Sequence, residues 1–141
     1  MTSLKILIDS GQLKTLAGNT IALSELAGRV VLFVNVASRC GLTPQYEGLV
    51  ALQASRRSNG FTVIGVPCNQ FGKQEPGTPQ EIQNFCATSY GVDFPLLEKQ
   101  NVNNPDRSDL YEWLVNSPAG GGKNVGWNFA KFLVGRDGSV I

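Results

Sequence analysis

Residues 30–66 have the sequence VVLFVNVASRCGLTPQYEGLVALQASRRSNGFTVIGV, which predicts two strands joined by one helix. Val30–Val36 is a continuous apolar run rich in β-branched residues, the pattern of a strand buried on both faces of a sheet. Phe61–Val66 has the same character and follows the Asn59-Gly60 break. Because strand–helix–strand units in one sheet are almost always right-handed, we expect these two strands to be parallel.

The helix between the strands carries its own start signal. Thr43 is a residue type that caps helices, and Pro44 follows at the first helical position, where proline is favoured. Tyr46 and Leu49 then follow helical spacing, so the helix is expected to run to about Arg57.

Patterns outside this unit complete the expected architecture. They predict an N-terminal β-hairpin over residues 12–23, helices beginning at the Thr78–Glu81 capping box and at Asp109, a strand over Trp127–Val134, and the start of its antiparallel partner at Val140–Ile141. We therefore predict a single domain, residues 1–141, with an α/β thioredoxin-like fold: a mixed central sheet flanked by helices. The C-terminal helix that usually closes such a fold is absent, so we expect either a shortened chain or an exposed apolar sheet face.

The overall composition excludes several classes of protein. The chain has 12 basic and 11 acidic side chains, so no basic excess points to a nucleic-acid partner. No signal peptide is visible at the N-terminus, and no apolar run is long enough to cross a bilayer. We expect a soluble, cytoplasmic protein without stable membrane insertion.

The counts of cysteine and histidine narrow the chemistry further. The chain has three cysteines and no histidine. A Ser-His-Asp triad, a Cys-His dyad and the usual catalytic zinc site are therefore impossible. A reactive cysteine in this chain needs some group other than imidazole to stabilise its thiolate.

Cys40 is the first candidate for such a reactive cysteine. It lies between the buried strand and the expected helix start, where backbone N–H groups and the helix dipole favour a thiolate. Arg39 adds a positive charge, unless its side chain faces water. The bland alternative is a buried, inert cysteine. The common C-x-x-C redox motif is absent because Thr43 stands at the second cysteine position, which disfavours a dithiol oxidoreductase.

Three longer segments resemble the glutathione peroxidase family. They are NVASRCGLTPQY at residues 35–46, PCNQFGKQEPG at residues 67–77 and WNFAKFL at residues 127–133. Together they are far more specific than any one short motif. The resemblance implies a peroxidase that reduces hydrogen peroxide and organic or lipid hydroperoxides, with no metal, flavin or nucleotide cofactor.

The resemblance also implies a catalytic set of Cys40, Gln74, Trp127 and Asn128. The two amides and the indole offer N–H donors that stabilise a thiolate and orient a peroxide. Taken singly, Gln74 has the character of an exposed loop residue, Trp127 of a core aromatic and Asn128 of a turn residue. Only their joint occurrence favours a functional role. Asn69 is a weaker candidate, as a support for the loop that carries Gln74.

The two remaining cysteines are assigned different roles. Cys68 follows a strand and is interpreted as structural. Cys86 lies on a helix expected over residues 80–89, where it is either a small buried hydrophobe or, as the resemblance implies, the resolving cysteine of thioredoxin-dependent members. In that case Cys40 forms a sulfenic acid, Cys86 closes a disulfide with it, and thioredoxin reduces the disulfide. If the two cysteines lie apart, the helix must open locally.

Three alternatives remain open at this point. They are a glutathione-dependent peroxidase, a peroxide-sensing redox relay and a redox-inert structural domain. Residues 116–126 are short and Gly-rich, where tetrameric glutathione-dependent members carry a longer insertion. We therefore expect a monomer with an open site that accepts bulky lipid hydroperoxides.

Overall fold

The computed structural model describes residues 2–141, and its centre is a three-stranded mixed sheet. The strands are β1 (Val30–Val36), β2 (Phe61–Pro67) and β3 (Lys131–Val134), in the order β2-β1-β3. β1 is parallel to β2 and antiparallel to β3. The helices are α1 (Thr2–Asp9), α2 (Gln45–Arg56), α3 (Pro79–Phe85) and α4 (Asp109–Asn116), with short 3-10 turns at Leu23–Glu25 and Arg57–Asn59 and a π-helix at Cys86–Tyr90.

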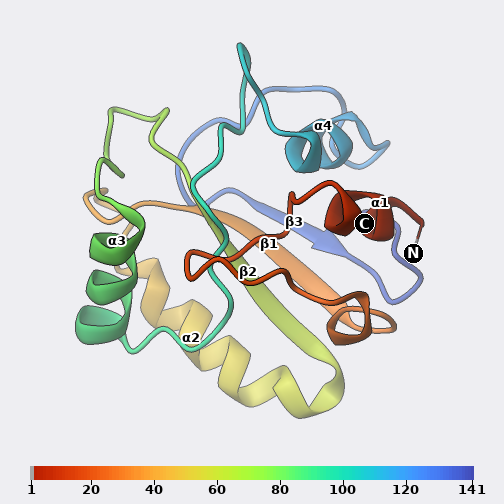
Figure 1. The fold of residues 1–141 in the computed structure, drawn as a ribbon, viewed down its shortest axis with the longest axis horizontal. Coiled ribbons are helices and arrows are strands. Elements are labelled where there is room, and N and C mark those ends of the chain that lie inside the picture. Colours follow the sequence, from red (N-terminus) through yellow and green to blue (C-terminus); the bar gives the residue numbers. More distant parts are fainter. Residues whose placement is uncertain (1) are drawn as a thin grey trace.

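Helices cover both faces of the sheet, with α2 and α3 on one side and α1 and α4 on the other (Figure 1). The side chains of β1 alternate between the two layers, because successive residues of a strand point to opposite faces. Val31 and Phe33 pack in the core with α1 and α4, whereas Val34 and Val36 pack in the core with α2. β1 is therefore buried on both faces, as its apolar run predicts. The expected thioredoxin-like α/β architecture is confirmed.

The face that carries α2 is less completely covered than the other. Leu32 and Leu133 are partners in the β1–β3 ladder and share this face, and both are partly exposed. Val31 and Val134, on the opposite face, are fully buried. This pair is a partly exposed apolar spot on the sheet and not an extended exposed face.

Several local predictions are confirmed. The capping box is formed, since the Thr78 hydroxyl accepts from the Glu81 N–H while the Glu81 carboxylate accepts from the Thr78 N–H. The N-terminal hairpin is present in a short form, with one antiparallel bridge between Lys14 and Thr20. The partner of β3 is likewise reduced to one bridge, Val134 to Val140.

Other local predictions are wrong. Thr43 does not cap α2, because its hydroxyl is used by the chain before it. The last strand begins at Lys131 rather than Trp127, since Phe129 adopts a left-handed φ of 64° that ends the extended run. The helix expected over residues 80–89 ends as an α-helix at Phe85 and continues as the π-helix. α1 was not predicted, because no start signal precedes it.

Candidate functional site

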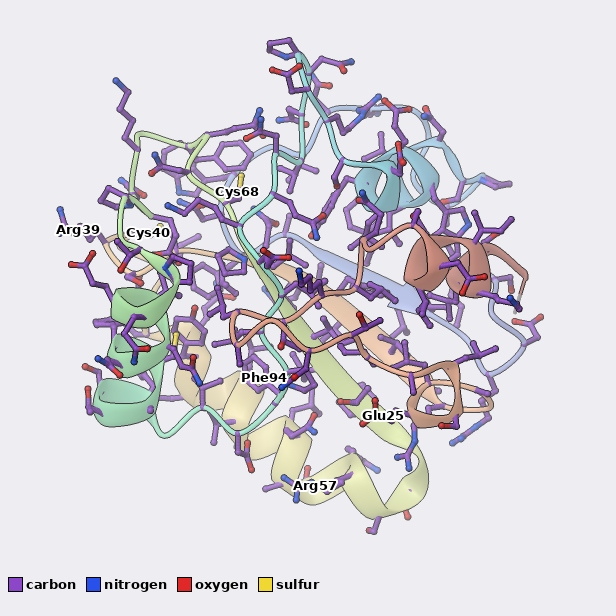
Figure 2. All side chains as sticks on the ribbon, viewed as in Figure 1. Glu25, Arg39, Cys40, Arg57, Cys68 and Phe94 are labelled. Carbon is purple, nitrogen blue, oxygen red and sulfur yellow. The ribbon has the colours of Figure 1, made fainter. Side chains whose placement is uncertain are left out.

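Cys40 lies in the turn between β1 and α2, at the same end of the sheet as Cys68 (Figure 2). The Leu42 N–H donates a hydrogen bond to Cys40 Sγ, with 3.3 Å between the nitrogen and the sulfur. Cys40 is 8% exposed and packs in the same core cluster as Tyr46 and Cys86, so its side chain is largely buried. A backbone N–H aimed at the sulfur stabilises the thiolate, which is the nucleophilic form.

Thr43 holds this turn closed. Its hydroxyl accepts a hydrogen bond of 2.9 Å from the Cys40 N–H and donates one of 2.8 Å to the carbonyl oxygen of Ala37. The Thr43 N–H in turn donates to the Cys40 carbonyl oxygen at 3.0 Å. The side chain that the sequence presented as a helix cap therefore fixes the backbone of the candidate nucleophile.

Two of the predicted site residues are joined directly. Asn128 Nδ2 donates a hydrogen bond of 3.0 Å to Gln74 Oε1, which joins loops 54 residues apart in the sequence. Asn128 is 2% exposed and Gln74 is partly buried. The contact fixes the orientation of the Gln74 amide and leaves its Nε2 group without a hydrogen-bond partner within residues 2–141. Gln74 thus presents a free N–H donor.

The loop of Gln74 is bound to the loop of Cys40. The Arg39 N–H donates to the Gln74 carbonyl oxygen at 3.0 Å, and the Ser38 N–H donates to Glu75 Oε1 at 3.1 Å. Two consecutive residues before Cys40 are therefore paired with two consecutive residues of the other loop. Their spacing is set by one backbone contact and by the Glu75 carboxylate, without the side chains of Cys40 or Gln74.

Asn35 anchors the third loop to the end of β1. Its Nδ2 donates to the Trp127 carbonyl oxygen at 3.0 Å, and its own carbonyl oxygen accepts the Phe129 N–H at 2.6 Å. Asn35 is fully buried. A signal for this role was present in the sequence, since Asn35 is the one polar residue in the apolar run of β1.

Left-handed backbone flanks both amide donors. Within residues 2–141, Lys73 (φ 53°) and Phe129 (φ 64°) are the non-glycine residues with positive φ, and they adjoin Gln74 and Asn128. Such conformations cost free energy in residues with a Cβ and collect at functional sites. The two loops hold their donors in place at some expense of backbone strain.

Trp127 is too exposed for the alternative interpretation as a core aromatic. The side chain is 42% exposed and packs against Phe71 with 5.4 Å between ring centroids. Its indole N–H donates to no acceptor in the described part of the chain. The residue therefore forms an apolar, hydrogen-bond-donating rim beside Asn128 and not a core element.

Neither the predicted amide donors nor the indole bonds to the Cys40 sulfur in this structure. Within the described residues, the hydrogen bond to Cys40 Sγ comes from Leu42. The structure brings Gln74 and Asn128 into contact and ties both loops to the Cys40 turn. A donor to sulfur or to a bound peroxide is available from Gln74 Nε2 and from the Trp127 indole.

Unpartnered buried oxygens gather around these loops. Of the six buried side-chain atoms without a partner in the described chain, four belong to Asn35, Ser38, Glu75 and Asn128. Native proteins keep few such atoms, and each one calls for an explanation. Their concentration here is consistent with a site built to do chemistry rather than to maximise stability.

Cys86 is placed at the junction of α3 and the π-helix. It is 1% exposed, and its thiol donates a hydrogen bond of 3.4 Å to the Tyr46 hydroxyl. Burial raises the pKa of the Cys86 thiol to about 11, with a further contribution from the negative charge of Glu75, while the bond to Tyr46 acts in the opposite direction. Cys86 is thus held as a thiol and forms no disulfide with Cys40.

Cys68 is fully buried after β2. Its thiol lies 3.6 Å from Gln70 Oε1, and burial raises its pKa. This environment agrees with the structural role predicted for Cys68.

The described residues contain neither a candidate metal site nor a helix that could span a membrane. No group of three or more Cys, Asp or Glu side chains in residues 2–141 is arranged to hold a metal ion. None of the described helices is long and apolar enough to span a membrane.

Comparison with known proteins agrees with the motifs. Residues 8–115 match the glutathione peroxidase family. The chain is 60% identical over 129 residues to the hydroperoxy fatty acid reductase Gpx2 of Synechocystis sp., covering 92% of this chain and 81% of that protein. It is 44% identical over 149 residues to the thioredoxin/glutathione peroxidase BtuE of Escherichia coli, covering 91% and 81%. The crystal structure of T. cruzi GPX1 superposes with a TM-score of 0.71 at 33% identity, covering 95% of this chain and 82% of that one.

Proposed function

The chain belongs to the glutathione peroxidase family and is a thiol-dependent peroxidase that reduces hydroperoxides, and on this premise we propose that Cys40 is the sulfur that reacts. The Cys40 turn is the observation that carries this assignment, because Cys40 is the most exposed of the three cysteines at 8% and its Sγ accepts the Leu42 N–H, whereas burial raises the pKa of Cys68 and of Cys86. Gln74, Trp127 and Asn128 are proposed to support the reaction from the neighbouring loops.

The first step consumes the peroxide. The Cys40 thiolate attacks the terminal oxygen of ROOH, the O–O bond breaks, and the alkoxide leaves with a proton as ROH. Cys40 becomes a sulfenic acid. The free Nε2 group of Gln74 and the Trp127 indole N–H are the donors proposed to stabilise the charge that develops on the departing oxygen.

The second step uses Cys86. Its thiol attacks the sulfenic sulfur of Cys40, a disulfide forms, and the hydroxyl of the sulfenic acid leaves as water with the thiol proton. Cys86 is bonded to Tyr46 in the structure, so its sulfur must leave that contact first. Its place at the first residue of the π-helix supports such an opening, since π-helices are rare and short and occur frequently at functional sites.

The third step returns both thiols. A dithiol protein of the thioredoxin class is proposed to attack the Cys40–Cys86 disulfide. Thiol–disulfide exchange then returns both thiols and leaves the disulfide on the reductant. The relative named thioredoxin/glutathione peroxidase supports either reductant. The presence of Cys86 favours thioredoxin, because glutathione can reduce a sulfenic acid without any resolving cysteine.

The preferred substrate is proposed to be an apolar hydroperoxide. Leu42, two residues after Cys40, is 41% exposed, and Trp127 is 42% exposed and packs on Phe71. These residues offer an apolar surface for an acyl chain. The relative named hydroperoxy fatty acid reductase points in the same direction. The chain is proposed to act as a monomeric single domain, which leaves this surface open.

One experiment tests the cycle. Peroxide consumption is measured with a thioredoxin system for the wild type, Cys40→Ser and Cys86→Ser. Cys40→Ser is expected to lose reaction with peroxide, and Cys86→Ser to consume one equivalent and then stop. Strong turnover of Cys86→Ser with glutathione would show that the enzyme is a glutathione-dependent peroxidase that needs no resolving cysteine. A wild type that stops after one equivalent with both reductants would favour a redox relay.

A further inference from the structure

Glu75 is a buried carboxylate that the proposed cycle does not use. It is 1% exposed and forms no salt bridge within the described residues. An unpaired buried charge is costly, so a side chain of this kind is rarely placed without a role. Its neighbours indicate what that role is.

The contacts of Glu75 link the loops of the candidate site. Its Oε1 accepts the Ser38 N–H at 3.1 Å, and its own N–H donates to Asn69 Oδ1 at 2.9 Å. The residue before it, Gln74, accepts the Arg39 N–H through its carbonyl oxygen. One side chain thus fixes the backbone two residues before Cys40 relative to the backbone of Gln74.

Three elements place titratable groups around this carboxylate. Tyr46 on α2, Cys68 after β2 and Cys86 on the π-helix all have pKa values raised in part by the charge of Glu75, whereas Arg39 and Lys99 favour the ionised carboxylate. The cleft beside it, about 220 Å³, is lined by Ser38, Arg39 and Glu75 together with Glu81 of α3. The carboxylate is therefore bonded to the Cys40 turn through Ser38 and lies close enough to Cys86 for its charge to act on that thiol.

A thiolate at Cys40 gains nothing from a nearby anion, so electrostatic activation is not the role of Glu75. What remains is geometry. The buried Glu75 carboxylate accepts a hydrogen bond from the Ser38 N–H and so sets the position of Ser38, which precedes Cys40 by two residues. We propose that Glu75 is a positioning residue, which fixes the Cys40 turn against the Gln74 loop in the arrangement that reacts with peroxide. This inference rests on the proposed role of Cys40.

The test compares Glu75→Ala with Glu75→Gln. Alanine removes the acceptor for the Ser38 N–H, whereas the glutamine amide oxygen keeps it without the charge. The measured quantity is the rate constant for oxidation of Cys40 by hydrogen peroxide in a single turnover without reductant. Glu75→Ala is expected to be slower by about tenfold or more, because small displacements of reacting groups have effects of this size. Glu75→Gln is expected to restore most of the rate.

A matched control separates positioning from general loss of stability. Gln53 is 5% exposed, and its Oε1 accepts the Val63 N–H at 2.7 Å between α2 and β2, where no candidate site residue lies. Gln53→Ala therefore also leaves a buried backbone N–H unpaired. It is expected to lower the melting temperature while leaving the oxidation rate at the wild-type value.

The outcomes are distinct. Equal slowing by Glu75→Ala and Gln53→Ala would overturn the positioning role, and so would a Glu75→Gln variant as slow as Glu75→Ala. If Glu75→Ala does not fold, Glu75→Asp withdraws the carboxylate from the Ser38 N–H by one methylene group, and a wild-type rate in that variant would overturn the proposal. Retained peroxide reaction in Cys40→Ser would instead refute the proposed function.

Discussion

The thiol of Cys86 donates a hydrogen bond of 3.4 Å to the hydroxyl of Tyr46, and both side chains are almost completely buried. Tyr46 lies in the first turn of α2, which follows Cys40, and its ring packs against Tyr90 at the end of the π-helix. One tyrosine therefore joins the element of the first cysteine to the segment of the second. The contact stabilises the separated state of the two sulfurs.

The first prediction concerns this contact. Tyr46→Phe removes a hydrogen bond worth about 1 kcal/mol and leaves the packing of the ring intact. Opening of the Cys86 segment should become about fivefold more favourable, and disulfide formation should accelerate accordingly. Rapid quenching followed by mass spectrometry of the alkylated protein measures this step. Slower disulfide formation would indicate that the Tyr46 hydroxyl assists the reaction and does not hold the thiol back.

The second prediction concerns alkaline pH. Because the pKa of Cys86 is about 11 in the folded protein against an ordinary value of 9.0, the folded state binds more protons than the unfolded state in this interval. Stability is therefore expected to fall as pH rises from about 9 to 11, by about 2–3 kcal/mol for this group. Urea unfolding at both ends of the interval should show a smaller loss in Cys86→Ala. If Cys86→Ala loses as much unfolding free energy over this pH interval as the wild type, the effect comes from Tyr46 and Cys68, whose pKa values are also raised.

The third prediction concerns Thr43. Thr43→Val keeps the shape of the side chain but leaves the Cys40 N–H and the Ala37 carbonyl oxygen without their partner. The free energy of unfolding should fall by about 1–3 kcal/mol, and oxidation of Cys40 should slow. Thr43→Ser keeps the hydroxyl and serves as the control. Calorimetry and single-turnover oxidation give the two quantities, and a fast Thr43→Val variant would show that the turn needs no such bond.

The fourth prediction concerns Asn128. Asn128→Asp and Asn128→Ala both remove the N–H donor to Gln74 Oε1, although only alanine removes volume. Loss of a fixed donor at a site of this kind typically slows the reaction by about 100-fold, and both variants should approach that value. Peroxide oxidation of Cys40 in stopped flow is the measurement. A wild-type rate in Asn128→Asp would show that the amide is not needed to orient Gln74.

The fifth prediction concerns acid pH. Burial raises the pKa of Glu75 above its ordinary value of 4.5, so the folded protein retains this proton to higher pH than the unfolded chain. The contribution of Glu75 to stability is then lost as pH rises from about 4.5 through its folded pKa. Glu75→Gln has no such titration, and its melting temperature should exceed that of the wild type more at pH 7 than at pH 4. An equal difference at both values would mean that the carboxyl is not titrating in this interval.

Much of the fold was predictable because its signals are local. The apolar run of β1 and the capping box at Thr78 depend on residues within one element, and both are confirmed. The errors arose where a contact distant in sequence decided the structure. Phe129 takes a left-handed conformation because its loop is bound to Asn35, which lies 94 residues earlier in the chain, and no local pattern at residue 129 predicts this.

The candidate site was predictable from the three motifs as a set of residues but not as a set of contacts. Gln74 and Asn128 were expected as N–H donors, but the bond between them, which leaves the Gln74 Nε2 group as the remaining donor, was not foreseen. The roles of Asn35, Thr43 and Glu75 were missed, because their partners are backbone groups and a sequence does not reveal where backbone hydrogen bonds go.

The seclusion of Cys68 bears on how the chain withstands oxidants and electrophiles. Three thiols can form three different disulfides, and a disulfide that includes Cys68 would leave the enzyme inactive. Cys68 is fully buried and its pKa is raised, so it neither alkylates nor exchanges readily while the fold is intact. Scrambling is thereby suppressed by solvent exclusion alone, and a toxic aldehyde or excess peroxide is expected to consume Cys40 long before it damages Cys68.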